Sequence, residues 1–280
     1  MAGDSLQKTV ERCNRQSSIM PLGGAVMAAD GTLRCRFEIK YRISESRAAA
    51  IEKFIQLYLR PDRYCKLQPT GSYPIVSLYL DSPDLMLCRE SLTGKTNRFK
   101  LRIRGYSDDP GYPKFFEIKR RLNSVIIKDR QRVIPSDVER LLSGGALPEQ
   151  YYSTEQESLK QFLFYLHCIS ARPIIQVRYI RKAYEDDSEN RVRITFDRKL
   201  CYKMCTQPNV TLNGTGWQRH PINDVVLEIK FTSRFPAWLT RMARCFELQQ
   251  QSFSKYTNCV QGASALKFGA PGVYGFNGTE

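Results

Sequence analysis

The sequence predicts an α+β fold in which an antiparallel sheet of eight strands closes into a barrel, with helices packed on its outside. Three observations lead to this prediction. Eight runs alternate apolar and polar side chains, as half-buried antiparallel strands do. Helical segments with one apolar stripe lie between the runs, and such a stripe has to pack on an apolar surface. The charged faces of the strands carry far more cations than carboxylates, and a closed sheet gives those charges a shared interior.

Each predicted strand is rich in β-branched or aromatic residues and is bounded by turn residues. In the stretch FKLRIRGY, Lys100, Arg102 and Arg104 point to one face because side chains alternate along a strand. A single strand of this kind often just faces water, but here the pattern recurs with mostly positive charge. The strands are predicted at 34–41, 75–81, 99–106, 114–121, 124–133, 173–184, 191–200 and 225–231.

The predicted helices have start and stop signals. The segment 44–60 begins with serine and stops at Pro61, and the segment 82–94 begins with Ser-Pro and ends with glycine. Their apolar stripes would cover the apolar faces of the strands. The remaining helices are predicted at 136–145, 154–170, 236–248 and 254–262.

The chain of 280 residues is predicted to form one domain with a flexible segment at each end. Residues 1–32 are polar and then Gly-rich, which predicts a disordered N-terminal arm. Residues 33–262 show no internal repeat, linker or composition shift, so they are expected to form a single domain. Residues 263–280 are rich in Gly and aromatic residues and are expected to form a flexible C-terminal tail.

Composition narrows the class of partner. Lys and Arg number 43 against 28 Asp and Glu, a formal charge of +15 that favours nucleic acid, an acidic membrane surface or a polyphosphorylated ligand as the partner.

Nine cysteines and two histidines are scattered without C-x-x-C spacing, which disfavours a zinc site or a disulfide framework. Reduced thiols suggest a cytoplasmic protein. No stretch reaches the roughly 20 apolar residues of a membrane span.

The predicted inward face has a large excess of positive charge. It holds thirteen cations and four carboxylates, and unpaired buried ions are costly, so an anion from outside the chain is expected. An eight-stranded barrel has room for one narrow ligand, and a triphosphate or polyphosphate fits both width and charge. Glu38, Glu117 and Glu228 are candidates to hold Mn²⁺ or Mg²⁺ through oxygen ligands. The face comprises Arg36, Glu38, Lys40, Lys100, Arg102, Arg104, Glu117, Lys119, Lys128, Arg130, Arg132, Arg178, Arg191, Arg193, Asp197, Glu228 and Lys230.

Eight short motifs occur in a fixed order between residues 37 and 256: FEIKY, SLYLDSPDL, KLRIRGY, FFEIKRR, VRYIRKAY, VRITFD, VLEIKF and SKY. In this order they closely resemble the vacuolar transporter chaperone (VTC) domain, the polyphosphate polymerase branch of the CYTH-like triphosphate tunnel metalloenzymes. The resemblance implies a tunnel barrel that binds the triphosphate of ATP. It also implies metal-dependent transfer of the terminal phosphoryl group to a growing inorganic polyphosphate chain.

The resemblance assigns roles to residues within these motifs. It implies that Glu228 is a metal ligand, and that Lys255, on a helix, could cap one mouth of the tunnel. On the first strand, Arg36 stands where the wider superfamily has the first glutamate of E-x-E-x-K. That departure disfavours simple triphosphatase or cyclase chemistry. The implied phosphate ligands are Lys40, Arg102, Arg104, Lys119, Lys128, Arg130, Arg178, Arg193 and Lys255.

Three other functions stay open at this stage. One is a non-catalytic polyphosphate-binding or accessory domain, and another is a triphosphatase acting on nucleoside or RNA 5′ triphosphates. The third is a nucleic-acid-binding protein, which is disfavoured because the predicted inward face offers few aromatic side chains for base stacking. The expected partners are therefore ATP and inorganic polyphosphate, without nucleic acid. A membrane protein that exports polyphosphate would be a separate chain, and only such a partner would bring this cytoplasmic protein to a membrane.

Overall fold

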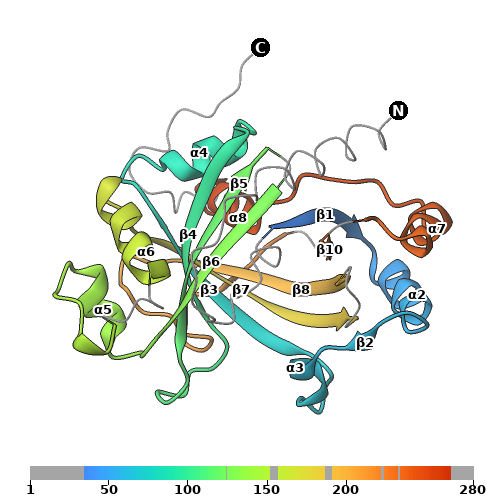
Figure 1. Ribbon diagram of the computed structural model, residues 1–280, viewed down its shortest axis with the longest axis horizontal. Coiled ribbons are helices and arrows are strands. Elements are labelled where there is room, and N and C mark those ends of the chain that lie inside the picture. The colour runs from blue at the N-terminus through green and yellow to red at the C-terminus, as the bar shows by residue number, and fades with distance from the viewer. Residues whose placement is uncertain are drawn as a thin grey trace, which may run out of the picture.

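The computed structural model describes residues 35–123, 125–151, 157–186, 191–221, 224–232 and 234–265. These residues form a mixed α+β fold with one large antiparallel sheet and surrounding helices, which confirms the predicted class (Figure 1). The predicted arm at 1–32 and all but the first three residues of the predicted tail at 263–280 lie outside the described residues.

All eight predicted strands are present, with ends that differ by a few residues from the prediction. Two further strands of two residues each, β2 (Arg60–Pro61) and β9 (Gln218–Arg219), are too short to leave a pattern in the sequence. The long strands are β1 (Cys35–Ile43), β3 (Tyr73–Asp81), β4 (Asn97–Gly105), β5 (Lys114–Leu122), β6 (Val125–Val133), β7 (Arg172–Glu185), β8 (Arg193–Met204) and β10 (Val225–Phe231).

The strands follow the order β2-β7-β3-β4-β5-β6-β1-β10-β8-β9, and β7 also pairs with β8. Directly opposite residues of neighbouring strands place their side chains on the same face. Arg102 lies opposite both Tyr79 and Glu117, and Lys40 lies opposite Glu228. The register therefore gathers charges from distant parts of the sequence on one face, called the inner face below.

The helices are α2 (Glu45–Ile55), α3 (Arg63–Lys66), α4 (Met86–Leu92), α5 (Asp137–Leu142), α6 (Glu157–Cys168), α7 (Ala237–Cys245) and α8 (Lys255–Ala265), with a 3-10 turn at Glu149–Tyr151. As predicted, Ser44 caps α2, accepting a hydrogen bond from the Arg47 amide at 3.3 Å. The helix ends earlier than predicted, because residues 60 and 61 pair with β7 instead. None of the described helices is both long and apolar enough to cross a bilayer.

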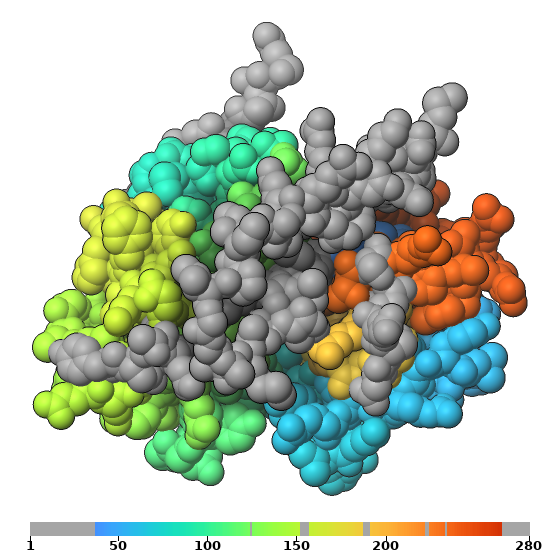
Figure 2. All heavy atoms as spheres, viewed as in Figure 1, coloured from blue at the N-terminus to red at the C-terminus, as the bar shows by residue number. Residues whose placement is uncertain are grey.

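Two groups of helices cover the outer face of the sheet. Ile51 of α2 and Leu239 of α7 belong to one apolar core with Ile229 of β10. On the other side Phe162 of α6 packs on Phe116 of β5, with ring centroids 4.7 Å apart. In Figure 2 the blue α2 and orange α7 lie on one side of the molecule, and the yellow-green α5 and α6 on the opposite side. Helices therefore cover the apolar strand faces, as predicted.

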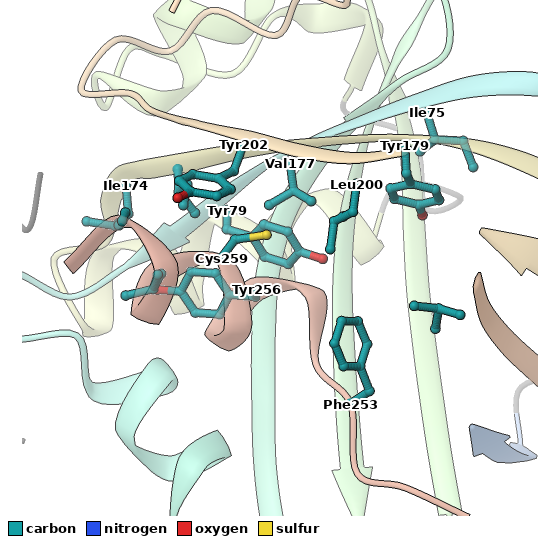
Figure 3. Close-up of a cluster of buried hydrophobic side chains, with 14 of the residues drawn as sticks. Ile75, Tyr79, Ile174, Val177, Tyr179, Leu200, Tyr202, Phe253, Tyr256 and Cys259 are labelled. Atoms are coloured by element: carbon teal, nitrogen blue, oxygen red, sulfur yellow. The ribbon is translucent and has the colours of Figure 1, made fainter. Parts of the chain in front are cut away.

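Helix α8 is the exception, because it packs on the inner face. Tyr256 stacks on Tyr79 at 4.7 Å between ring centroids, and its hydroxyl donates to Asp81 at 2.6 Å. Figure 3 shows these rings with Val177 and Cys259 in one apolar cluster. The prediction that all helices lie outside was wrong for α8, since the inner faces of β3 and β7 are largely apolar and need a cover.

Candidate functional site

A cavity of about 670 Å³ lies against the inner face and is bounded by the end of α4, the loop that follows it and the start of α8. Ten of its described lining residues are cationic and two are carboxylates, Glu38 and Glu228. A surface with this balance attracts a ligand of high negative charge. The cations are Lys40, Arg98, Lys100, Arg102, Arg104, Lys119, Arg121, Arg181, Lys230 and Lys255.

Glu117 is fully buried and surrounded by four cations. Its carboxylate accepts from Arg102 Nε at 2.8 Å and lies 2.7 Å from Lys128 Nζ and 3.3 Å from Arg130 Nε. Burial by itself would raise the pKa of Glu117, but Lys128, Arg102 and Arg104 lower this pKa well below its ordinary value. The ionised side chain therefore holds basic groups from β4 and β6 at fixed positions.

Glu38 and Glu228 form a second ionic cluster across β1 and β10. Lys40 Nζ lies 3.2 Å from Glu38 Oε1 and 3.7 Å from Glu228 Oε1. Lys119 Nζ lies 2.9 Å from Glu38, and Lys255 Nζ lies 3.1 Å from Glu228. Burial opposes ionisation of both glutamates, yet these lysines lower the pKa of each well below the ordinary value. Both carboxylates thus stay charged beside the cavity.

Burial lowers the pKa of three lysines at the site. Burial, followed by repulsion from Lys40 and Lys119, lowers the pKa of Lys100 well below its usual range. Its Nζ donates to Ser254 Oγ at 2.6 Å. Burial also lowers the pKa of Lys230 to about 8 and that of Lys128 to about 7, despite the nearby glutamates. An anion entering the cavity would reverse these shifts.

The structure brings most of the predicted site residues together. Six of the predicted residues from the strands line the cavity, and Glu117, Lys128 and Arg130 lie directly beside them. Arg193 is also on the inner face, but its guanidinium donates to Asp62 Oδ2 at 2.6 Å and to Glu185, away from the cavity lining. The predicted residues that line the cavity are Lys40, Arg102, Arg104, Lys119, Glu38 and Glu228 from the strands, and Lys255 from α8.

Arg178 does not join the site, so its predicted inward orientation was wrong. It lies on the outer face of β7, opposite Val76, where it donates to the carbonyl of Leu212. Its guanidinium carbon lies 4.3 Å from the ring centroid of Trp217. Strand β7 has apolar residues on both faces, so side-chain alternation could not identify the inner one.

Arg181 takes the inner position on β7, and the sequence-based prediction missed it. Its side chain is buried and donates to both carboxylate oxygens of Asp197, at 2.6 and 2.7 Å. It also lies 3.7 Å from Glu228 Oε2. The sequence held part of the signal: Arg178 and Arg181 are three residues apart, so they face opposite sides of the strand and only one of them can face the cavity.

The fold and the site define a mixed α+β protein whose antiparallel sheet presents a strongly basic cavity. The chain belongs to the VTC domain family, because the model of the VTC domain matches residues 35–263. This match confirms the resemblance seen in the ordered motifs. No match was found among curated proteins.

Three solved structures with similar folds have low sequence identity to this chain. A candidate adenylate cyclase from Bacillus halodurans is 12% identical, with a TM-score of 0.43 over 78% of this chain and 93% of its own. HpAC1 from Hippeastrum, described as a candidate adenylyl cyclase with dominant triphosphatase activity, is 14% identical, with a TM-score of 0.44 over 81% and 96%. PH1819 from Pyrococcus horikoshii is 10% identical, with a TM-score of 0.42 over 81% and 99%.

Proposed function

We propose that this protein is a polyphosphate polymerase that transfers the terminal phosphoryl group of ATP to a growing polyphosphate chain. The observation that carries the proposal is the cavity lined by ten cations and two carboxylates. Charge-assisted hydrogen bonds from arginine and lysine to phosphate oxygens would offset the cost of burying these cations. Membership of the VTC domain family supports the choice of chemistry.

The proposal includes a sheet that closes into a tunnel, as the sequence predicts. The pairing of β7 with β8, in addition to β3, supports this shape because it links strands from the two ends of the strand order. A tunnel suits a linear polyanion, since its wall can contact phosphates on all sides.

In the proposed reaction, an oxygen of the terminal phosphate of the acceptor chain attacks the γ-phosphorus of ATP. The new oxygen–phosphorus bond forms as the bond to the β,γ-bridging oxygen breaks, and ADP leaves. No protein nucleophile is needed, so catalysis depends on in-line positioning and charge neutralisation. Arg102 and Arg104 would bind the transferring group, held in place by Glu117.

A divalent cation, Mn²⁺ or Mg²⁺, fits two of the three predicted carboxylates. Glu38 and Glu228 both line the cavity, and magnesium beside phosphates commonly uses one or two carboxylates plus phosphate oxygens and water. Glu117 does not fit, because its side chain is fully buried and does not line the cavity. No cluster of three or more His, Cys, Asp or Glu in the described residues forms a complete metal site. When bound, the cation would neutralise charge on the phosphate oxygens.

The test incubates purified protein with ATP and Mn²⁺, stains a gel for polyphosphate and measures free orthophosphate in parallel. Wild type is expected to make long chains, and Arg104→Ala to lower turnover by about 100-fold or more. Arg178→Ala is the matched control, because Arg178 lies on the outer face, and it should retain most of the activity. Orthophosphate without chains would instead identify a triphosphatase, and polyphosphate binding without ATP consumption an accessory domain.

A further inference from the structure

Four aromatic side chains meet at the end of the inner face where β4 finishes. Tyr106 and Tyr64 have nearly parallel rings, with centroids 6.4 Å apart and planes inclined by 6°. Tyr73 lies 5.7 Å from Tyr64, and Phe115 lies 5.8 Å from Tyr106. These four residues are called the aromatic cluster. They were not part of the charged inward face derived from the sequence.

The aromatic cluster directly continues the rows of cations. Phe115 lies opposite Arg104 on the neighbouring strand, and Tyr106 follows Arg104 by two residues. Tyr73 lies opposite Arg181. Residues two apart on a strand lie on one face about 7 Å apart. A ligand whose phosphates contact Arg104 and Arg181 therefore has the aromatic cluster as its next neighbour.

Arg130 contacts both the aromatic cluster and the cation cluster around Glu117. Its guanidinium carbon lies 3.6 Å from the ring centroid of Phe115, and Nη2 donates to the hydroxyl of Tyr106 at 3.3 Å. The same guanidinium lies 3.3 Å from Glu117, at the centre of the cation cluster. One side chain thus contacts both the predicted phosphate-binding groups and the aromatic rings.

Tyr64 is 45% exposed, and the helix that carries it, α3, is anchored at its start. Asp62, which is buried, caps α3 by accepting from the Cys65 amide at 2.7 Å and also accepts from the Tyr73 hydroxyl at 3.0 Å. Arg193 pairs with the same carboxylate. An exposed ring on an anchored helix, packed against Tyr73 and Tyr106 at the end of the rows of cations, is suited to stack on a planar ligand.

We propose that the aromatic cluster binds the base of a nucleoside triphosphate whose phosphates extend from Arg130 toward Arg104 and Arg181. This inference rests on the proposed function and deepens it. Stacking tolerates any base, because every base has a π-face. The proposal also gives the bound ligands a direction along the cavity. The nucleoside lies near α3, and the polyphosphate chain extends toward Arg98 and Arg121 at the other end of β4, where α4 lies (Figure 1).

The test compares the dissociation constants of ATP and inorganic tripolyphosphate for wild type and variants, measured by calorimetry. Tyr64→Ala is expected to weaken ATP binding by about ten-fold, while tripolyphosphate binding changes by less than about two-fold. Tyr64→Phe keeps the ring and should bind ATP like wild type. Phe164→Ala removes an exposed ring from the outer helix α6 and is the matched control.

Two results with the variants would overturn the base site. One is an equal loss of ATP and tripolyphosphate affinity in Tyr64→Ala, and the other is unchanged ATP binding in both Tyr64→Ala and Tyr106→Ala. The second variant keeps the test decisive if the first does not fold. Wild type that binds both ligands but makes no chains would refute the proposed polymerase while the base site is still measured. Wild type that binds neither ligand would refute both.

Discussion

Binding of a phosphate chain is expected to draw protons onto the buried lysines. Lys230 lines the cavity, and in the free protein its pKa is lowered to about 8, mainly by burial. At pH 9 a group with that pKa is only about one-tenth protonated. A polyanion beside it would return the pKa toward the ordinary lysine value of about 10.4, where protonation at pH 9 is nearly complete.

The size of the effect follows from these values. Lys230 should gain about 0.9 proton at pH 9, and Lys128, whose pKa is lowered to about 7, should gain about one more. These two lysines together account for about two protons per tripolyphosphate bound. At pH 6 both lysines are already charged in the free protein, so the uptake from them should approach zero.

Calorimetry in pairs of buffers with different ionisation enthalpies measures this number directly, since the slope of heat against buffer enthalpy is the proton count. Lys230→Met should lower the uptake at pH 9 by about one proton. Arg178→Ala, which changes the charge outside the site, should leave the count unchanged. Uptake below about half a proton in wild type, or no difference in Lys230→Met, would refute an anion site next to Lys230.

Three further outcomes are expected. Arg181→Ala should weaken tripolyphosphate binding far more than Arg178→Ala in the same titration, because only Arg181 faces the cavity; equal losses would contradict this orientation. Glu117→Gln should lower the free energy of unfolding in urea by about 3–5 kcal/mol, since it leaves buried cations without their carboxylate, and tripolyphosphate should restore part of the loss. The free protein should become more stable above pH 8, because folded Lys230 loses its proton near pH 8 while the unfolded chain keeps it to about 10.4. The share of this gain that comes from Lys230, about 2 kcal/mol between pH 7.5 and 10, should be absent in Lys230→Met.

The sequence predicted best those strands whose two faces differ. In β4, Lys100, Arg102 and Arg104 alternate with apolar residues, so the inner face could be recognised from the amino-acid pattern alone. In β7 the inner and outer faces are both largely apolar, and only cross-strand pairing shows that Arg181 rather than Arg178 faces the cavity. Alternation thus identifies a face only where one side is polar.

The sequence also could not predict on which face of the sheet α8 packs. An apolar stripe predicts that a helix packs on a sheet, but it does not say on which side. The decisive feature is the apolar patch of Tyr79, Val177 and Tyr179 on the inner face, which comes together only when β3 pairs with β7. The surroundings of Glu117 were also beyond sequence reasoning, since only the register of β4, β5 and β6 places Arg102 and Arg130 opposite it.

The carboxylates of the site hold its excess cations in fixed positions. The site has too few carboxylates to neutralise its cations, so an anion is still needed. Glu117 and Glu228 nevertheless each contact several basic groups at once. A cation held this way does not have to reorganise when phosphate arrives, which is the condition for strong electrostatic stabilisation of a transferring phosphoryl group. A variant that keeps every cation but loses Glu117 should therefore lose more in turnover than in phosphate affinity. The reason is that affinity depends on total charge, whereas turnover depends on where Arg102 and Arg104 are held.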